Sequence, residues 1–586
     1  MHLPARHALP VAALSVCLVA ASLALAPSVG AAEPDPQAEP ATAPVRRSPP
    51  SLPRQSPVRL EHHGILRFRP QLILGGDLGL GRDGSSPIPP PIAATTGDDP
   101  DASALRWADL RLRWEPTLHL GDSLSVHVGL DLVDGLVLGS TWTDASGVPM
   151  AGLTSDAAAP QSAGDFGWDD ALQVRALYGR WLAFDMFEVI VGRVPDHFGL
   201  GLVRNDGLCP DCDFGSVVDM ASVAFTISGF RIQGTWEYTA TGATTDLALA
   251  AERQSGGQPK DLGLSDDVST YTLRAGRFPV SPVELEARRV ALDERREWAI
   301  DWALFSSFTD QTLSSMEQIE STSLECRPEE ELANGQPVQP YHCIRLFRRG
   351  AFIWRPGLWL RAERRPDMLT SLRVELEAGG LFGEIDHPQR LLEADALEAK
   401  DFAGFGAALE VEWRRDTLAL GVDVGLATGD DGEFVGVLDG QNVVDPDDDA
   451  WATNDVLRKN RTITSYMFAR DYHLDLILFR QVLGAVTNAF YLKPWVSTAV
   501  LDTEETRLTL RLDALYAIAM RPSGTPADGD QWGIEVDARA LLELRSGFRA
   551  SLEAGVLVPL DALNHPTSGA TGDPAFTIRS VLGWQF

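Results

Sequence analysis

The sequence predicts an all-β protein, a closed antiparallel transmembrane β-barrel of about 18 strands, within a range of roughly 16 to 20. Three observations predict this fold. Apolar and polar residues alternate within segments along most of the chain. The connections between these segments are short and long in turn, and the final segment ends on an aromatic residue. Alternation with a period of two indicates strands, because successive side chains of a strand point to opposite faces.

Composition narrows the class of protein. The chain has 586 residues, and 82 acidic side chains against 50 basic ones give a formal charge of −32. This excess of acid argues against a nucleic-acid partner, because phosphate binding needs clustered Lys and Arg. Beyond the N-terminus no run of about 18 apolar residues occurs, so a helical membrane protein is not expected.

The N-terminus has the pattern of an export signal. Arg6 supplies positive charge, an apolar stretch runs over residues 9–25, and small residues follow at Ala31 and Ala32. This pattern predicts a signal peptide over residues 1–32, removed on passage through the inner membrane. Residues 33–60 are rich in proline and have little to bury, so we expect a disordered periplasmic tether. The barrel should then occupy residues 61–586.

The alternating segments distinguish a barrel from a soluble sandwich. Leu508, Leu510 and Leu512, for example, alternate with Thr509 and Arg511. Sandwich strands average about 5–6 residues, whereas transmembrane strands need about 9–11. The segments here are long and their polar faces carry many full charges, which a wet lumen can accommodate. We therefore expect the apolar faces to meet lipid.

The connections give an independent indication. Short ones, at residues 121–123, 185, 228–229, 415–416 and 545–547, alternate with long polar ones. The long ones lie near residues 81–104, 139–168, 195–215, 241–266, 309–348, 384–401, 429–484, 520–529 and 559–574. This is typical of bacterial outer-membrane barrels, with short turns and both termini in the periplasm. An even strand number requires residues 462–484 to form a helix within a long outer loop, and their apolar spacing is compatible with one.

The C-terminal strand supports export to the outer membrane. Phe576, Ile578, Leu582, Trp584 and Phe586 share one face. The terminal Trp584 and Phe586 resemble the sorting signal that the barrel-assembly machinery reads. We therefore expect that machinery, outer-membrane lipid and lipopolysaccharide as partners.

Several stretches resemble a family of exported, porin-like barrels of Gram-negative bacteria without an assigned function. They are HHGILRFR at residues 62–69, GRVPDHFGLG at 192–201, NDG at 205–207, CPDCDFG at 209–215 and VTNAFYLKP at 486–494. The landmarks are spread over residues 62–586. The resemblance implies an outer-membrane barrel, and it assigns no functional residue.

Four cysteines remain after the signal peptide. Cys209 and Cys212 have the spacing of a redox motif but lie in a predicted loop without a thioredoxin-like context, so a structural disulfide is favoured. Cys326 and Cys343 could form a second one, although three connectivities are open. A zinc site would need two further ligands near Cys209, and only His197 is close in sequence.

Other chemistry is not supported by motifs. Residues 429–433 and 445–449 are acidic clusters that could bind Ca²⁺ or the divalent ions that bridge lipopolysaccharide, but the second lacks EF-hand spacing and solvated loops are favoured. No recognisable motif pairs a serine with His119 or His127, so a barrel-borne hydrolase is an unsupported alternative. We expect no enzymatic activity, no cofactor and no metal.

The alternation along the strands predicts that a set of charged side chains faces the lumen, and many of them are arginines. Such a set creates a field that selects polar or charged solutes. The leading hypothesis is a channel for passive or selective diffusion of small polar or charged solutes. The main alternative is a loop-plugged barrel acting as a surface scaffold or adhesin, and the oligomeric state stays open. The lumen-lining candidates are Arg67, Arg69, Arg111, Arg113, Arg231, Arg373, Glu375, Glu410, Arg511, Asp513, Arg539 and Arg579.

Overall fold

The computed structural model describes most of the chain beyond the predicted tether. The described residues are 58–76, 78–79, 104–137, 172–184, 186–240, 267–318, 343–386, 399–430, 462–565 and 569–586. The predicted signal peptide, nearly all of the tether and the acidic residues 445–449 lie outside them. So does Cys326, and the second predicted disulfide is therefore untested.

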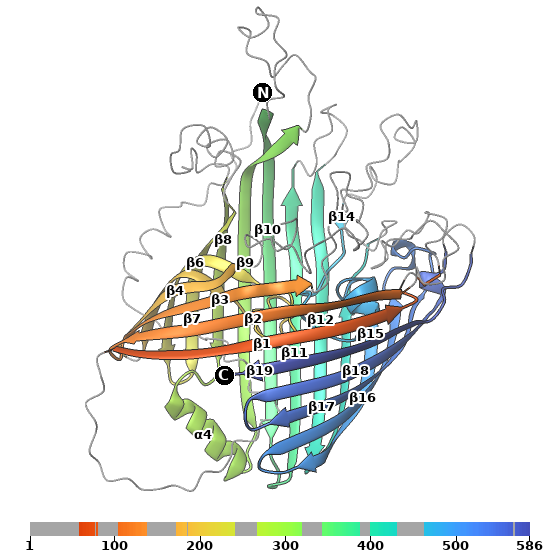
Figure 1. Cartoon of the computed structure of the whole chain (residues 1–586). Helices are drawn as coiled ribbons and strands as arrows, with labels where there is room; N and C mark the ends of the chain where they lie inside the picture. The colour runs from red at the N-terminus through yellow and green to blue at the C-terminus, as the bar shows by residue number, and fades with distance from the viewer. Residues whose placement is uncertain are drawn as a thin grey trace, which may run out of the picture.

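The described strands form one continuous sheet, antiparallel except for the two-residue strand β14, with short helices in its connections (Figure 1). The strands are β1 (Val58–Leu74), β2 (Ala104–Leu120), β3 (Leu124–Val137), β4 (Gln173–Ala183), β5 (Phe187–Pro195), β6 (Val217–Ile227), β7 (Phe230–Ala240), β8 (Val268–Arg277), β9 (Ala299–Gln318), β10 (Cys343–Arg364), β11 (Thr370–Ile385), β12 (Lys400–Arg415), β13 (Leu418–Ala427), β14 (Thr462–Ile463), β15 (Ala489–Asp502), β16 (Thr506–Ala519), β17 (Gln531–Leu544), β18 (Phe548–Pro559) and β19 (Ala575–Gln585). The helices are α4 (Pro282–Asp293), the π-helix η6 (Leu478–Val482), and the short 3₁₀ turns η7 (Pro522–Gly524) and η8 (Asp561–Leu563).

The sheet closes on itself. Strand β1 pairs with β2 on one side and with β19 on the other, with Leu66 opposite Leu112 in β2 and Trp584 in β19. β14 is a two-residue strand that pairs in parallel with β12 alone, at Asp401 and Phe402, while β13 pairs directly with β15. Eighteen long strands therefore close the barrel, and the predicted fold class is confirmed.

The strand ends differ from the predicted boundaries in two places. β1 begins at Val58, inside the segment assigned to the tether, because Val58–Gly64 pairs with the end of β2. β9 and β10 pair from Ala299 as far as Gln318 and Cys343, so the connection predicted at 309–348 is much shorter than expected.

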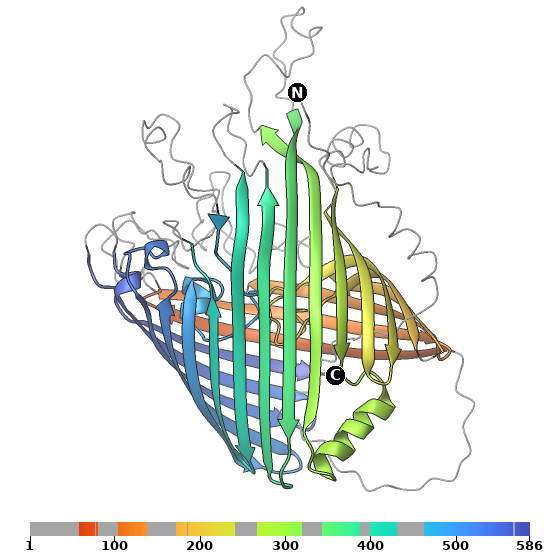
Figure 2. The same cartoon turned by 180° about the vertical axis from the view of Figure 1, so that it is seen from behind.

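The helices also differ from expectation. The connection between β8 and β9 contains α4, which the alternation pattern did not indicate. Ser281 caps this helix, its hydroxyl accepting from Glu284 N–H while Glu284 accepts from the Ser281 backbone. Figure 2 shows α4 beside the short-turn ends of the neighbouring strands. Among the described residues, no helix is long and apolar enough to cross a membrane.

The prediction of a helix over residues 462–484 is wrong. Only the five residues of η6 are helical, and the rest of the stretch is irregular apart from the two residues of β14. Its backbone N–H groups are instead held by carboxylates of Glu535 and Asp475, which satisfy donors that a helix would have satisfied internally.

The outer face of the barrel is apolar. Large apolar side chains are exposed all around the sheet, among them Leu304, Leu358, Leu420, Leu492, Ile534, Val556 and Ile578. Aromatic rings gather toward both ends, with Phe308 and Trp354 stacked at 6.3 Å near the long connections and Phe548 and Trp584 at 5.1 Å near the short turns. An apolar band between aromatic belts is the surface that a transmembrane barrel presents to lipid.

Candidate functional site in the barrel lumen

The polar face of the sheet lines the lumen. Arg67, Asp109, Arg113, Asp131 and Glu375 are at most 3% exposed, although they alternate with exposed apolar residues on the same strands. The predicted lumen candidates all lie on this inner face, with Arg231 beside Glu188 and Gln233. Arg373, Glu410, Arg511 and Arg539 border one cavity, described below. Arg193 pairs with Asp219 at 2.8 Å, and both side chains are about half exposed.

Two connections fold into the lumen. We call residues 196–216 the first lumen segment and residues 464–488 the second. The backbone N–H groups of Leu202 and Val203 donate to Glu377 of β11, and those of residues 476–478 donate to Glu535 of β17. Both segments are therefore fastened to wall carboxylates, which belong to two different strands. Both belong to connections that the alternation pattern assigns to the outer loops, because no local pattern shows where a loop turns.

The first segment carries its acidic residues into a cluster of arginines. Asp211 accepts from Arg69 of β1 at 3.0 Å, from Arg579 of β19 at 2.6 Å and from Arg480 of the second segment at 2.7 Å. Asp213 contacts Arg69 at 2.8 Å and Arg67 at 3.1 Å. We call these side chains the arginine clamp. Its members come from four distant parts of the chain, and alternation could place only the strand residues Arg67, Arg69 and Arg579 in the lumen without pairing them.

The arginine clamp keeps both aspartates ionised. Burial alone would raise the pKa of Asp211, but Arg480, Arg579 and Arg69 hold it well below its usual value. Arg69 and Arg67 likewise hold the pKa of Asp213 below its usual value against the effect of burial. The wall also binds the backbone of the segment, since Arg67 and Arg111 both donate to the carbonyl of Cys212. Arginine is suited to this role because its planar group makes several charge-assisted hydrogen bonds at once.

The second segment builds an apolar core inside the barrel. Phe468, Leu476, Ile477, Leu478 and Val482 are buried against apolar residues of the wall, which include Tyr491, Leu515, Trp532, Leu557 and Leu563. The indole Nε1 of Trp532 donates to the carbonyl of Asn488 at 2.8 Å. A packed core of this kind fixes the segment on one side of the lumen, because each buried large apolar side chain contributes about 1.5–3 kcal/mol.

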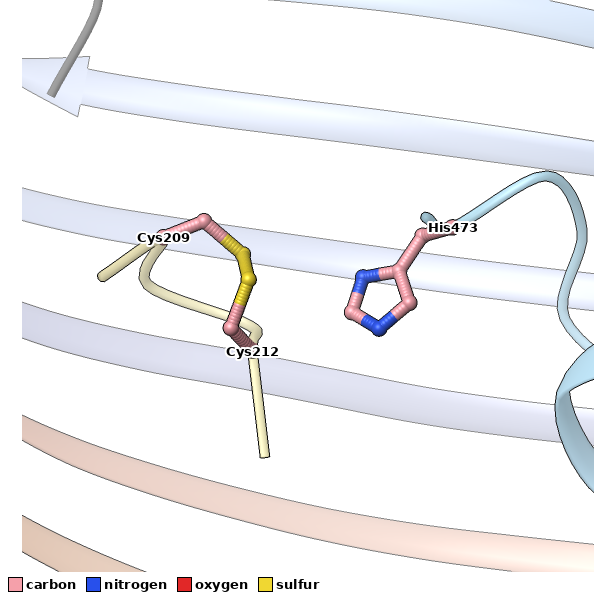
Figure 3. Close-up of side chains that lie close together, drawn as sticks. All are labelled: Cys209, Cys212 and His473. Carbon is pink, nitrogen blue, oxygen red and sulfur yellow. A yellow bond between two sulfur atoms is a disulfide. The ribbon is translucent and has the colours of Figure 1, made fainter. Parts of the chain in front are cut away.

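A disulfide joins Cys209 and Cys212 within the first segment. Figure 3 shows the imidazole of His473, from the second segment, facing this bond. The two sulfurs and a His473 nitrogen lie within 4.8 Å of one another, and they form the one cluster of three potential metal ligands among the described residues. Because the sulfurs are bonded to each other, they offer no thiolates to a metal. His197, the ligand considered from the sequence, does not belong to this cluster.

Residues that the structure describes line an inner and an outer cavity of the lumen. The inner cavity, of 240 Å³, lies near the short turns and is lined by Arg373, Glu410, Glu412, Arg414, Asp423, His473, Lys493, Trp495, Thr509, Arg511, Arg539 and Leu541. The outer cavity, of 490 Å³, lies near the long connections and is lined by Gln173, Val174, Arg175, Arg193, Val203, Arg204, Ser216, Val217, Val218, Asp219, Glu237, Tyr238, Thr239, Thr270 and Arg355. The second lumen segment borders the inner cavity and the first borders the outer one.

Among the side chains that line each cavity, basic ones outnumber acidic ones, and several of the basic ones also pair with carboxylates behind the lining, such as Asp513 and Glu553. Five Lys and Arg side chains face three carboxylates in the inner cavity, and four arginines face two carboxylates in the outer cavity. This sign is opposite to the formal charge of −32 on the whole chain. The excess acid must therefore lie elsewhere.

A serine and a histidine do meet on the inner wall, although no sequence motif joins them. Ser125 Oγ lies 2.9 Å from His127 Nε2, and Thr117 Oγ1 lies 3.2 Å from His127 Nδ1. The third partner is a hydroxyl and not a carboxylate, Ser125 is buried, and neither lumen cavity reaches the pair. The arrangement is therefore unsuited to nucleophilic catalysis.

The chain was compared with known proteins. No family model and no curated protein matches the chain. Among solved structures, OccK8 (OprE) of Pseudomonas aeruginosa shares 8% identity over 90% of this chain and 98% of its own, with a TM-score of 0.43. OccAB3 of Acinetobacter baumannii shares 9% identity over 90% and 99%, with a TM-score of 0.42. The outer-membrane protein OmpT of Vibrio cholerae shares 8% over 91% and 99%, with a TM-score of 0.31.

The strand pairing of the chain itself is what decides its architecture. This protein is a closed antiparallel β-barrel. The barrel architecture that the sequence resemblance implies is thereby confirmed.

Proposed function

We propose that this protein is an outer-membrane channel through which small, mainly anionic solutes diffuse, narrowed by the two lumen segments. The observation that carries the proposal is the surplus of basic over acidic side chains among the residues that line both cavities of a strongly acidic chain. A low-dielectric wall strengthens the field of such a surplus and favours passage of the opposite charge. The apolar outer face and the aromatic belts support a position in the outer membrane.

The test is conductance of the refolded protein in a planar bilayer with a salt gradient. We expect discrete conductance steps and a reversal potential on the anion-selective side. Replacing Arg511 and Arg539 by glutamine should shift the reversal potential toward cation selectivity, because two of the five basic side chains of the inner cavity are lost. A cation-selective wild-type channel would contradict the proposed selectivity.

A second candidate function is supported by the ion pairs that cross the lumen. Arg480 in the second segment binds Asp211 in the first, and Arg579 of the wall binds the same carboxylate. Segments fastened to each other and to the wall could close the barrel and leave it a scaffold for surface structures. Absence of conductance from protein shown to be folded and inserted would favour this function over the channel.

A further inference from the structure

Arg355, which lines the outer cavity, is not neutralised by the carboxylates around it. Arg204 contacts Asp196 at 2.6 Å and Glu237 at 2.7 Å, and Arg274 contacts the same Asp196 at 2.5 Å. The carboxylates nearby are thus shared by two guanidinium groups. Arg355, the third, forms no ion pair with any residue that the structure describes.

The hydrogen bonds of Arg355 are also incomplete. Its Nη2 donates to Thr309 Oγ1 at 3.3 Å, and its Nε is buried without an acceptor among the described residues. Arg355 is partly buried, so its guanidinium loses part of its hydration without a counter-charge that replaces it. Its N–H groups lie in one plane and match the two oxygens of a carboxylate or phosphate group.

A line of hydroxyl groups connects Arg355 to the rim of the cavity. Thr309 Oγ1 lies 2.8 Å from Thr270 Oγ1, which lies 2.7 Å from Thr239 Oγ1. Arginine can only donate, so Thr309 accepts from it and is free to pass its own proton to Thr270. If Thr270 in turn donates to Thr239, the hydroxyl proton of Thr239 is available to an acceptor in the cavity. Thr239 lines this cavity and is exposed.

We propose that Arg355, assisted by Thr239, forms a binding subsite for the oxyanion group, carboxylate or phosphate, of a small solute in the outer cavity. The subsite deepens the proposed channel function and rests on it, since it names the chemical group that the channel would select. Arg355 supplies the charge and a bidentate contact, and the Thr239 hydroxyl supplies a neutral donor.

Nuclear magnetic resonance of small probes can test the subsite without any conductance. Trifluoroacetate, observed by ¹⁹F, represents a carboxylate, and methylphosphonate, observed by ³¹P, represents a phosphate group. Folded full chain in detergent should broaden at least one probe signal in a saturable way. Arg355→Gln should weaken that binding by about tenfold or more, because a charge-assisted hydrogen-bonded contact is lost. Arg355→Lys, which keeps the charge without the planar fork, should lie between the two.

Arg289→Gln is the matched control. Arg289 lies exposed on α4, where it pairs with Glu286 at 2.6 Å, and it lines neither cavity. This variant should bind the probes as the wild type does, and circular dichroism would verify that each variant is folded. Equal binding by wild type and Arg355→Gln, equal losses in both variants, or no saturable broadening of either probe would overturn the subsite. Conductance without probe binding would refute the subsite alone, and probe binding without conductance would refute the channel alone.

Discussion

Single carboxylates hold the lumen segments in place. Glu535 is 1% exposed and accepts three consecutive backbone N–H groups, those of Leu476, Ile477 and Leu478, at 2.8–2.9 Å. An acceptor shared in this way explains why the stretch needs no regular helix. Its loss would leave three buried donors without partners, which costs more than the bonds themselves contribute.

Glu535→Ala should therefore release the second lumen segment. We expect a cost of about 3 kcal/mol, from unsatisfied donors at roughly 1–3 kcal/mol each with partial relief by water. Trypsin cleavage after Arg470 or Arg480 should accelerate by about two orders of magnitude, because it tracks the population of the open form. Glu543→Ala on the same strand, which removes an ion pair with Arg549, is the control. Equal cleavage of both variants would contradict the role of Glu535.

Acid should detach the first lumen segment. The pKa of Asp196 is lowered to about 2, since Arg274 and Arg204 outweigh the effect of burial, and the pKa values of Asp211 and Asp213 are also lowered. Carboxyls with lowered pKa values stabilise the fold above their ordinary pKa and lose that contribution as the pH falls from about 4 toward 2. For Asp196 the contribution is about 2 kcal/mol.

Two residues act closer to neutrality with opposite signs. Burial raises the pKa of Asp475 to about 6, so its contribution to the stability of the fold grows as the pH falls. Burial and Arg480 lower the pKa of His473, so the contribution of His473 to that stability shrinks as the pH falls. The melting temperature should therefore change little between pH 7 and 5 and fall steeply below pH 4. A melting curve by circular dichroism at each pH measures this, and a main loss already between pH 7 and 5 would be inconsistent with it.

At the scale of elements, the barrel strands and the two lumen segments obey different rules. The strands follow from alternation, so a shift of one residue would turn every charge toward lipid. The segments have no such periodicity. They hold their conformation through the arginine clamp, the apolar core and the Cys209–Cys212 disulfide.

Removing that disulfide should loosen the first lumen segment without unfolding the barrel. A disulfide that closes so short a loop lowers the conformational entropy of the unfolded chain, which stabilises the folded segment by about 2 kcal/mol. In the double variant Cys209→Ser, Cys212→Ser we expect faster trypsin cleavage after Arg204 and larger fluctuations of conductance. The double variant Cys326→Ser, Cys343→Ser is the matched control, since it removes the same number of sulfurs elsewhere. Identical cleavage in the two double variants would show that the clamp alone holds the segment.

At the scale of the whole molecule, barrel closure depends on the C-terminus. Phe586 exchanges two backbone hydrogen bonds with Gly64, at 3.0 and 3.1 Å, and extends the pairing of β19 with β1 by one residue. A Cβ on Gly64 would lie 2.3 Å from the Phe586 ring and 2.7 Å from the carbonyl oxygen of Arg113, so glycine gives the ring and β2 the room they need.

Deleting Phe586 should lower the amount of folded barrel in the outer membrane several-fold, because both the seam and the proposed sorting signal lose their last residue. Gln585→Ala, which keeps the terminal aromatic ring, should assemble normally. The amount of heat-resistant folded protein in isolated membranes measures the difference. Equal amounts for the deletion and the wild type would contradict a role in assembly.

The sequence by itself determined the wall of this protein. A period of two is a local property, so the residues of each strand and the face of Arg67 or Glu375 follow from neighbours one or two positions away. The alternating connections then fixed the topology. The tertiary structure alone decided the interior: the inward course of residues 196–216 and 464–488, the convergence of Arg69, Arg480 and Arg579 on Asp211, and the unpaired state of Arg355 among the described residues. These contacts join residues up to 368 positions apart. Their energy depends on burial and charge in three dimensions, which no local pattern records.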